Sequence, residues 1–383
     1  MAPERAALLP GLPYKHEPLA TNAQQIRLFR LVSINTLKGF GTQGIRIPGQ
    51  LQTFDLNQCP SFQALSYVWG NANPEQRYTV HLDGFELEVR RNLFDFLELY
   101  GSLTKSRFDR IFPTHAHTDK SPYTSWLWID QICIDESNGK ERGHQVQLMK
   151  KIYKEAAQVI VWLGRDDKDT ANVLADLRKQ RSSLGMKIIG SRLEQNHKHS
   201  GRRADILAKN EYWSRLWVAQ EFCLARTLTL LCCREYDDVR ECFGWQSREP
   251  EYQINAVNLI SLRVERNLEG LRHREAPFIL KTFATSKCHD PRDVVYGVLG
   301  LWHDKHQTWI TVDYNKSVED VFNDAIRILV KWYVKRHAVV WGKHADEHID
   351  VEGIYRLWHV LYHRTGVKIL PDEPTEREIA IAG

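Results

Sequence analysis

The sequence predicts an α/β fold with a mainly parallel sheet flanked by helices, extra N-terminal strands and a helical C-terminal extension. Residues 126–164 have the pattern of a buried strand, an amphipathic helix and a second buried strand, which indicates a crossover between parallel strands. After about residue 250 the pattern becomes helical. We therefore expect an α/β domain over residues 1–245 and a mainly helical extension over residues 246–383.

Short segments with strand patterns precede the central unit. In order, they are residues 26–32, residues 50–56, the apolar run 64–70 and a hairpin over 77–89. The hairpin is expected to turn at Asp83-Gly84, because this dipeptide favours two-residue turns. Asn92 is then expected to cap a helix.

The central unit gives the clearest signals. The apolar run 126–134 predicts a strand that is interrupted by Asp130 and Gln131. Asn138, with Glu141 three residues later, predicts a capping box at the start of the next helix. The apolar run VIVWLG then closes the unit as a buried strand.

Further elements are predicted beyond the central unit. Residues 212–224 predict one amphipathic helix, and residues 227–233 predict the next strand. In the extension, Asp290-Pro291 and Ser317 each predict the start of a helix.

Composition places the chain among globular proteins. Of its 383 residues, 43% are hydrophobic and 26% are charged, and the net charge of +4 is too small and too dispersed to indicate nucleic-acid binding. The seven cysteines form no CxxC pair, so we expect reduced thiols in a cytoplasmic protein. No apolar run suits a signal peptide or a membrane span, and no glycine-rich phosphate loop supports an ATPase or a dehydrogenase.

Several stretches resemble the fungal heterokaryon-incompatibility (HET) domain and the segment that follows it. They are FQALSYVWG, WIDQICIDESNGKERGHQVQLMKKIYKEAAQVIVWLG, YWSRLWVAQE, and CHDPRDVVYGVLGL with VDYNKSVEDVF. The resemblance covers residues 14–325, with one departure at Asp135-Glu136, where the family usually has Asn-Gln. It implies a role in programmed cell death after fusion of incompatible cells, an incompatibility partner protein, and activity as a homo-oligomer.

The resemblance also implies an enzymatic activity. HET domains are thought to be distant relatives of Toll/interleukin-receptor (TIR) domains, which have a flavodoxin-like sheet. Some TIR domains cleave NAD at the nicotinamide–ribose bond with a glutamate four residues after a tryptophan, and Trp217 and Glu221 have this spacing. A carboxylate suits this reaction because positive charge builds on the ribose in the transition state.

NAD or a related nucleotide is therefore the expected substrate, and no cofactor is expected. Glu221 is the expected catalytic residue, with Trp217 and Arg215 beside the substrate. The alternative is that Glu221 forms a structural salt bridge with Arg215 or Arg226.

Other substrate-binding residues are expected at two strand ends, because ligands bind outside the carboxyl ends of strands in open parallel sheets. These residues are Ser66, Tyr67, Trp69, Gly70, Asp130 and Gln131. Tyr67 or Trp69 can stack on a ring, whereas Asp130 and Gln131 can hold ribose hydroxyls. The alternatives are core packing for the first strand end and a helix cap or backbone hydrogen bond for the second.

Other interpretations of the sequence compete with this one. The main one is a non-enzymatic signalling module that acts by self-association or partner binding. A hydrolase with Cys133 as nucleophile and His144 as base is a weaker one, because strand cysteines are usually inert. No metal site is expected, since a convincing ligand spacing is missing at His115/His117, His197/His199 and Cys232/Cys233. The Asp290–Arg292–Asp293 cluster is expected to cap and charge-match a helix.

Overall fold

The computed structural model describes residues 12–32, 35–36, 45–70, 78–113, 121–184, 203, 205–238, 256, 258–260, 262–263, 276–283, 286–302 and 310–328. The chain divides into two compact units. The first is Met1–Trp213 with Ala225–Gln253, and the second is Ser214–Leu224 with Ile254–Gly383. The domain boundary predicted at residue 245 stays a prediction.

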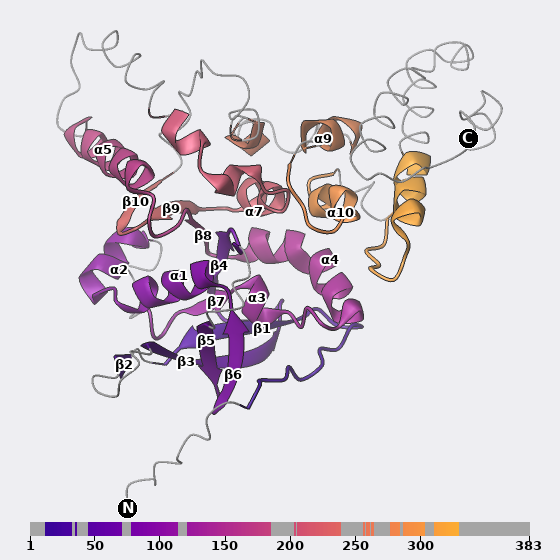
Figure 1. The fold of residues 1–383 in the computed structure, drawn as a ribbon, viewed down its shortest axis with the longest axis horizontal. Coiled ribbons are helices and arrows are strands. Elements are labelled where there is room, and N and C mark those ends of the chain that lie inside the picture. Colours follow the sequence, from indigo (N-terminus) through magenta and orange to yellow (C-terminus); the bar gives the residue numbers. More distant parts are fainter. Residues whose placement is uncertain are drawn as a thin grey trace, which may run out of the picture. The chain divides into compact units, whose positions relative to one another are not determined.

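All described strands belong to the first unit and form one sheet (Figure 1). They are β1 (Gln25–Leu31), β2 (Asn35–Thr36), β3 (Ile45–Asp55), β4 (Phe62–Tyr67), β5 (Tyr78–Leu82), β6 (Phe85–Val89), β7 (Trp126–Trp128), β8 (Gln158–Trp162), β9 (Leu228–Cys232) and β10 (Glu235–Asp238). Their order is β10-β9-β8-β4-β7-β1-β3-β5-β6, and β2 pairs with β3.

The centre of the sheet is parallel, which confirms the predicted α/β class. β4 runs parallel to β7 on one side and to β8 on the other, and β9 runs parallel to β8. Every residue of β4, β8 and β9 is buried, as is typical of parallel strands covered on both faces. The strands beyond β7 and β9 include antiparallel pairs, so the whole sheet is mixed. The finer expectation of a flavodoxin- or TIR-like fold stays a prediction.

The helices of the first unit cover both faces of the sheet. They are α1 (Arg91–Gly101), α2 (Lys105–Ile111), α3 (Asp130–Cys133), α4 (Gly139–Glu155) and α5 (Lys168–Leu184). Tyr100 of α1 donates its hydroxyl to Gln63 of β4 at 2.7 Å. Tyr153 of α4 packs on Trp128, which pairs with Ala64 of β4. Because Gln63 and Ala64 are consecutive in a strand, α1 and α4 lie on opposite faces.

The predicted hairpin is confirmed. β5 and β6 are antiparallel and turn at Asp83 and Gly84, whose φ angles are +50° and +89°. Two successive residues with positive φ indicate a type I′ turn, which explains the Asp-Gly dipeptide.

The strand predicted over residues 126–134 is too long. It ends at Trp128, and a short helical turn begins at Asp130. The Asp130 side chain accepts a hydrogen bond from the amide of Gln131 at 2.7 Å, and the Asp130 carbonyl accepts one from the Ile134 amide. These local bonds compete with strand pairing and close the turn.

Asn92 does not cap α1, so this prediction is wrong. The helix begins at Arg91 without a side-chain cap. The Asn92 side chain instead donates to the carbonyl of Val68 at 2.6 Å and accepts from Nε1 of Trp162 at 2.8 Å. Asn92 thus ties the segments at the ends of β4 and β8 to the start of α1.

The predicted capping box at α4 is half present. The Asn138 side chain accepts hydrogen bonds from the amides of Lys140 and Glu141, both at 3.2 Å, which confirms the cap. The Glu141 carboxylate pairs with Arg27 at 2.6 Å and accepts the amide of Asp135 at 2.8 Å. The tertiary ion pair has therefore replaced the local return bond of a capping box.

The described helices of the second unit are α7 (Val218–Leu224), α9 (Ala276–Phe283) and α10 (Asp293–Leu299), and residues 318–328 are also helical. The start predicted at Ser317 is confirmed, because the Ser317 hydroxyl accepts the amide of Asp320 at 3.1 Å. The two acids at the start of α10 act differently. Asp290 accepts the amide of Arg292, whereas Asp293 binds tertiary partners.

The single helix predicted over residues 212–224 is wrong. A short 3₁₀ helix over Glu211–Ser214 precedes α7, and the two are separate. The amide of Leu216 donates to the carbonyl of Lys287 at 2.9 Å, and the amide of Lys287 donates to the carbonyl of Ser214 at 2.6 Å. This pairing with a segment distant in sequence interrupts the helix.

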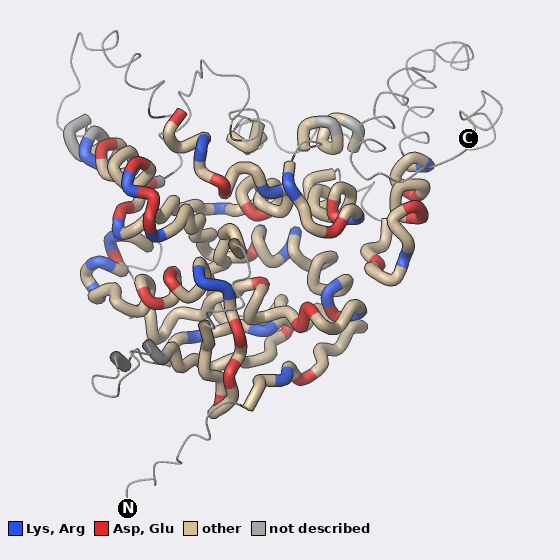
Figure 2. The backbone as a smooth tube through the Cα atoms, viewed as in Figure 1, with Lys and Arg blue, Asp and Glu red and all other residues tan. Residues whose placement is uncertain are grey.

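Figure 2 shows Lys and Arg positions interspersed with Asp and Glu along the chain, which agrees with the dispersed charge inferred from composition. Within the part of the chain that the structure describes, none of the helices combines the length and the apolarity needed to cross a membrane.

Candidate functional site

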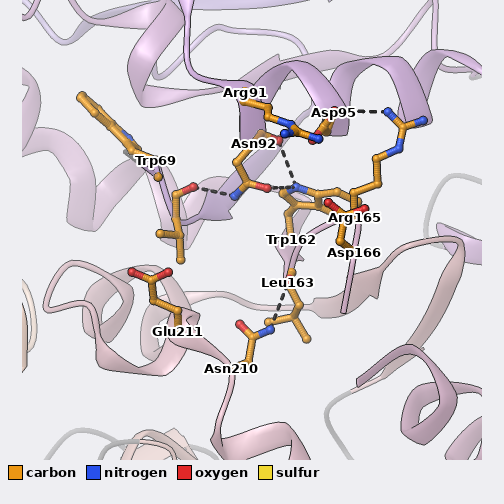
Figure 3. A pocket seen from close by; sticks show the side chains of 13 residues that line it. Trp69, Arg91, Asn92, Asp95, Trp162, Leu163, Arg165, Asp166, Asn210 and Glu211 are labelled. Carbon is orange, nitrogen blue, oxygen red and sulfur yellow. Dashed lines mark hydrogen bonds and ion pairs between the residues drawn. The ribbon is translucent and has the colours of Figure 1, made fainter. Parts of the chain in front are cut away.

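The first unit contains a cavity of about 420 Å³ beside the ends of β4 and β8, here called the switch-point pocket (Figure 3). It is lined by Val68, Trp69, Gly70, Arg91, Asn92, Asp95, Trp162, Leu163, Gly164, Arg165, Asp166, Asn210 and Glu211. The segment after β4, the start of α1, the end of β8 with the loop after it, and the start of the 3₁₀ helix thus all contribute.

The position of this pocket follows from the strand order. After β4 the chain forms β5, β6, α1 and α2 before it returns as β7 on one side of β4, and from β7 it passes to β8 on the other side of β4. The direction of winding therefore reverses between β4 and β8. In open α/β sheets, the crevice outside the carboxyl ends of such strands is where ligands bind.

Two glycines allow the chain to turn away at this crevice. Gly70 has a φ of +76° and Gly164 a φ of +106°, which side-chain-bearing residues rarely adopt. These turns leave room beside the strand ends. The Asn92 side chain lies between the two strand ends and connects them through its hydrogen bonds to Val68 and Trp162 (Figure 3).

The indole of Trp69 is held in place by a hydrogen bond to Asp130. Its Nε1 donates to Oδ2 of Asp130 at 2.7 Å, and Oδ1 of the same carboxylate accepts the Gln131 amide. Trp69 is partly exposed. A fixed, partly exposed indole offers a flat surface for stacking.

The charged side chains of the pocket form a network with α1. Arg165 pairs with Asp95 at 3.2 Å and also with Glu98, and Arg91 lies 3.6 Å from Asp95. Burial raises the pKa of Asp95, although the hydrogen bond and charge of Arg165 oppose this shift. The hydrogen bond to Glu98 raises the pKa of Arg165. Both guanidinium groups are therefore engaged by acids of α1.

Glu211 lines the pocket from the side opposite Asn92 (Figure 3). Its neighbours in sequence are both anchored. Asn210 donates to the carbonyl of Leu163 at 3.0 Å, and the Tyr212 hydroxyl lies 2.7 Å from that of Ser66. One anchor reaches the end of β8 and the other reaches β4, so Glu211 is held between the two strands.

The structure separates the predicted strand-end residues into two groups. Trp69 and Gly70 line the pocket, and Asp130 contacts Trp69. Ser66 and Tyr67 are 0% and 1% exposed and lie in the core, with the Tyr67 hydroxyl 3.4 Å from Oε1 of Gln131. Binding of a ring or ribose by these six residues stays a prediction.

The remaining predicted residues lie in the second unit. Arg215 forms a parallel bridge with Lys287, Trp217 precedes α7, and Glu221 lies within α7. Glu221 is only 2% exposed and its neighbour Gln220 is 1% exposed. Because Glu221 belongs to one unit and Asp130 and the β4 end to the other, their predicted convergence on one cleft stays a prediction.

Trp217 is held by a hydrogen-bond network within the second unit. Its Nε1 donates to Oδ2 of Asp293 at 3.0 Å, and the hydroxyl of Tyr314 donates to Oδ1 at 2.7 Å. Arg292 donates to the carbonyls of Tyr314 and Lys316. The helix cap predicted for this cluster at Asp290-Pro291 is wrong, because α10 begins at Asp293 without a side-chain cap. The cluster instead joins three segments that are distant in sequence.

The weaker alternatives gain no support. Burial raises the pKa of the Cys133 thiol to about 12, and Nε2 of His144 donates to the carbonyl oxygen of Ala23 at 2.9 Å. Among the described residues, no group of three or more His, Cys, Asp or Glu side chains could hold a metal ion. The two His-x-His pairs lie outside the described residues.

Several pocket residues were missed by sequence reasoning: Arg91, Asn92, Asp95, Trp162, Arg165, Asp166, Asn210 and Glu211. The available signal was the charged run 165–167 directly after the buried strand 159–164, at a position where α/β sheets bind ligands. Glu211 gave no local signal, because its place in the pocket depends on tertiary anchors.

Comparison with known proteins gives a domain match and a relative. A family model for heterokaryon incompatibility protein (HET) matches residues 62–221, a region that contains the whole switch-point pocket. The chain is 26% identical over 351 residues to heterokaryon incompatibility protein 6, OR allele, of Neurospora crassa; the match covers 75% of this chain and 50% of the relative. The chain thus spans about half the length of that relative. No solved structure matches the chain. Residues 62–221 of the chain thus match the heterokaryon incompatibility (HET) domain, and the chain is similar to a heterokaryon incompatibility protein.

Proposed function

We propose that this chain acts in heterokaryon incompatibility, as an effector of fungal self/non-self recognition and cell death in the cytoplasm. The HET domain and the named relative support this role. An incompatibility partner protein and self-association belong to the same proposal.

The proposed chemistry is cleavage of NAD at the nicotinamide–ribose bond. Water replaces nicotinamide at the ribose carbon, so that NAD and water give ADP-ribose, nicotinamide and a proton. The observation that carries this proposal is the switch-point pocket. It lies where α/β sheets bind nucleotides, its volume is within the range of small-molecule sites, and Trp69 offers a stacking surface.

Glu221 is the proposed catalytic residue, on the spacing that it shares with TIR domains. Its carboxylate would stabilise the ribosyl cation that forms as nicotinamide leaves. Trp217, which Asp293 holds through a hydrogen bond, would shield the carboxylate from water. Arg215 belongs to the proposed substrate-binding set and pairs with the Lys287 segment.

The test is to incubate the purified full chain with NAD at high protein concentration and to measure free nicotinamide. Glu221→Gln keeps the shape of the side chain but removes its charge. We expect at least a ~100-fold loss of turnover, which corresponds to about 2.7 kcal/mol of transition-state stabilisation. Glu155→Gln, at a surface ion pair with Arg226, is the matched control and should retain full turnover.

Two outcomes would contradict this scheme. Unchanged turnover in well-folded Glu221→Gln protein excludes Glu221 as the catalytic residue. Absence of nicotinamide release by the wild-type chain, whether dilute or concentrated, excludes the enzymatic proposal but leaves the role in incompatibility untouched.

The burial of Glu221 favours a second candidate, a non-enzymatic signalling module that acts by self-association or partner binding. A carboxylate that is 2% exposed is expected to serve the packing of its helix. In that case Glu221→Gln lowers the melting temperature. The folded variant should still self-associate, as measured by light scattering, and should still cause death of the cells that express it.

A further inference from the structure

We propose that Cys232 and Cys233 form a reversible oxidation site, in which a peroxide closes the two thiols into a disulfide and releases the loop over residues 164–167. This loop, here called the 164–167 loop, lines the switch-point pocket. The proposal rests on the proposed function only in regarding that pocket as the place where the ligand binds. The oxidation and the release of the loop are tested without NAD.

The turn between β9 and β10 brings the two thiols to one side. Successive side chains of a strand point to opposite faces, so adjacent cysteines ordinarily diverge. Cys233, however, has a φ of +52° and is the first residue of the two-residue turn between Cys232 and Glu235. As a result, both sulfur atoms approach the carbonyl oxygen of Asp167, Cys232 Sγ to 3.3 Å and Cys233 Sγ to 3.8 Å.

The residue type at this turn position is unusual. A positive φ is uncommon for residues other than glycine, and hairpin turns that need it at their first central position favour glycine. Cysteine occupies the position in this chain, although it makes the backbone conformation less favourable. An uncommon backbone conformation that places two thiols together points to a role for the side chains.

In the reduced state the two cysteines hold the 164–167 loop. The Cys233 thiol donates to the carbonyl of Arg165 at 2.7 Å, and the Cys233 amide donates to the carbonyl of Gly164 at 2.9 Å. The Cys232 thiol lies 3.5 Å from the same Gly164 oxygen. Gly164, Arg165 and Asp166 all line the switch-point pocket (Figure 3). The thiol pair is therefore connected to the pocket through one short loop.

The two thiols differ in access to solvent. Cys232 is buried, whereas Cys233 is half-buried. Burial raises the pKa of both thiols, which keeps them protonated, as their hydrogen bonds to the loop require. The Cys232 thiol lowers the pKa of Cys233, because it can donate to the Cys233 sulfur. We therefore expect slow oxidation that begins at Cys233, with Cys232 as the resolving thiol.

The reaction needs a two-electron oxidant, which hydrogen peroxide supplies. The Cys233 sulfur attacks one peroxide oxygen, the O–O bond breaks, and a sulfenic acid and water form. The Cys232 sulfur then displaces hydroxide from the sulfenic sulfur, so that the S–S bond forms and a second water leaves. The two thiols are oxidised, the peroxide is reduced, and the two waters carry away both thiol protons.

The disulfide is expected to be easily reduced. Consecutive Cα atoms lie about 3.8 Å apart across a trans peptide bond, which is below the usual range for disulfides. The resulting strain makes the bond more reducible, so a thiol reductant should restore the pair.

The first experiment detects the disulfide. The reduced full chain is treated with hydrogen peroxide, its remaining thiols are alkylated, and it is digested with trypsin. Trypsin cleaves after Arg226 and Arg234, so both cysteines fall in one peptide, TLTLLCCR. We expect mass spectrometry to show that this peptide has lost two hydrogen atoms and escapes alkylation, and that dithiothreitol restores both thiols.

Two variants test the order of the steps. In Cys232→Ser the sulfenic acid of Cys233 lacks its resolving thiol and should be trapped by dimedone. Cys59→Ser removes another half-buried cysteine, which lies outside the pocket lining, and is the matched control. It should form the disulfide in TLTLLCCR as the wild type does.

The second experiment measures the release of the loop by hydrogen exchange. The reporters are the Cys233 amide, which donates to the Gly164 carbonyl, and the Leu163 amide, which donates to the Leu231 carbonyl. A disulfide has no S–H donor, so oxidation removes the thiol hydrogen bonds to the loop. We expect both amides to exchange about 10-fold faster after oxidation, as suits the loss of hydrogen bonds of ordinary net strength. In Cys233→Ser the pair cannot close, and exchange should not respond to peroxide.

Several results would overturn the proposal. Two alkylatable thiols in TLTLLCCR after peroxide treatment, or a disulfide from this peptide to another part of the chain, exclude the oxidation site. Failure to trap Cys233 in Cys232→Ser contradicts the order of attack. Unchanged exchange of both amides in the oxidised protein, or equal acceleration in Cys233→Ser, refutes the connection to the pocket. Nicotinamide release by the reduced chain reports on the proposed function alone, and its absence leaves the oxidation site standing.

Discussion

The ion pair between Arg27 and Glu141 makes the strongest stability prediction. Their side chains are 3% and 1% exposed, and the guanidinium meets the carboxylate at two points, 2.6 Å and 3.0 Å. Arg27 also donates to the carbonyls of Cys133 and Glu17, and Glu141 accepts the amide of Asp135. One pair thus joins β1, the start of α4 and the N-terminal segment before β1.

Glu141→Gln removes one charge and keeps the volume of the side chain. The buried guanidinium then lacks its counter-charge, which costs about 3–5 kcal/mol when one partner of a buried pair is lost. With a urea dependence of about 3 kcal/mol per molar, the unfolding midpoint of the first unit should fall by about 1–1.7 M.

Glu155→Gln is the internal control for this prediction. Its pair with Arg226 has a similar distance, 2.7 Å, but the side chains are 39% and 56% exposed. An exposed pair contributes at most about 1 kcal/mol, so its midpoint shift should stay below about 0.3 M. Equal shifts for the two variants in urea unfolding, followed by tryptophan fluorescence, would refute the argument that burial sets the cost.

Other predictions follow from the same contacts. Burial acts to raise the pKa of Glu141, but the hydrogen bonds from Arg27 and Asp135 and the Arg27 charge outweigh it, so the pKa lies below 4.5. This stabilisation is complete above about pH 4.5 and is lost as pH falls through the folded-state pKa, so wild type should lose stability in acid more steeply than Glu141→Gln. Asn138→Ala removes the cap of α4 and should cost about 1 kcal/mol in urea unfolding, whereas an unchanged midpoint would contradict the cap. Tyr212→Phe removes the buried bond to Ser66 and should cost about 1 kcal/mol; a neutral result would show that this anchor is not needed. Thiol titration of denatured, unreduced protein should find all seven cysteines free, as the six described ones are, and five or fewer would contradict the prediction.

The sequence by itself determined the centre of the fold. Mostly apolar runs marked β4, β8 and β9, because strands buried on both faces favour apolar side chains. The Asp83-Gly84 turn was also readable, because its backbone conformation restricts residue choice locally. The stretches that resemble the HET domain were sufficient on their own to indicate it, because both their residues and their order along the chain match that domain.

Tertiary structure decided where side chains with more than one option went. Asn92 and Glu141 both have local partners that a sequence pattern predicts, yet they bind strand ends and Arg27 instead. The helix expected over 212–224 is interrupted because its backbone pairs with Lys287, far away in sequence. Local propensity is worth less than such long-range bonds once the core has formed.

The candidate site shows the same division. Trp69 and Gly70 were predicted from their place at a strand end, and they line the pocket. Glu211 and Asn210 could not be predicted. Their position depends on the hydrogen bond of Asn210 to Leu163 and on that of Tyr212 to Ser66, and both partners lie many residues away in sequence. A strand end is a local property of the sequence, whereas the pocket opposite it is made by whichever distant segment the fold brings there.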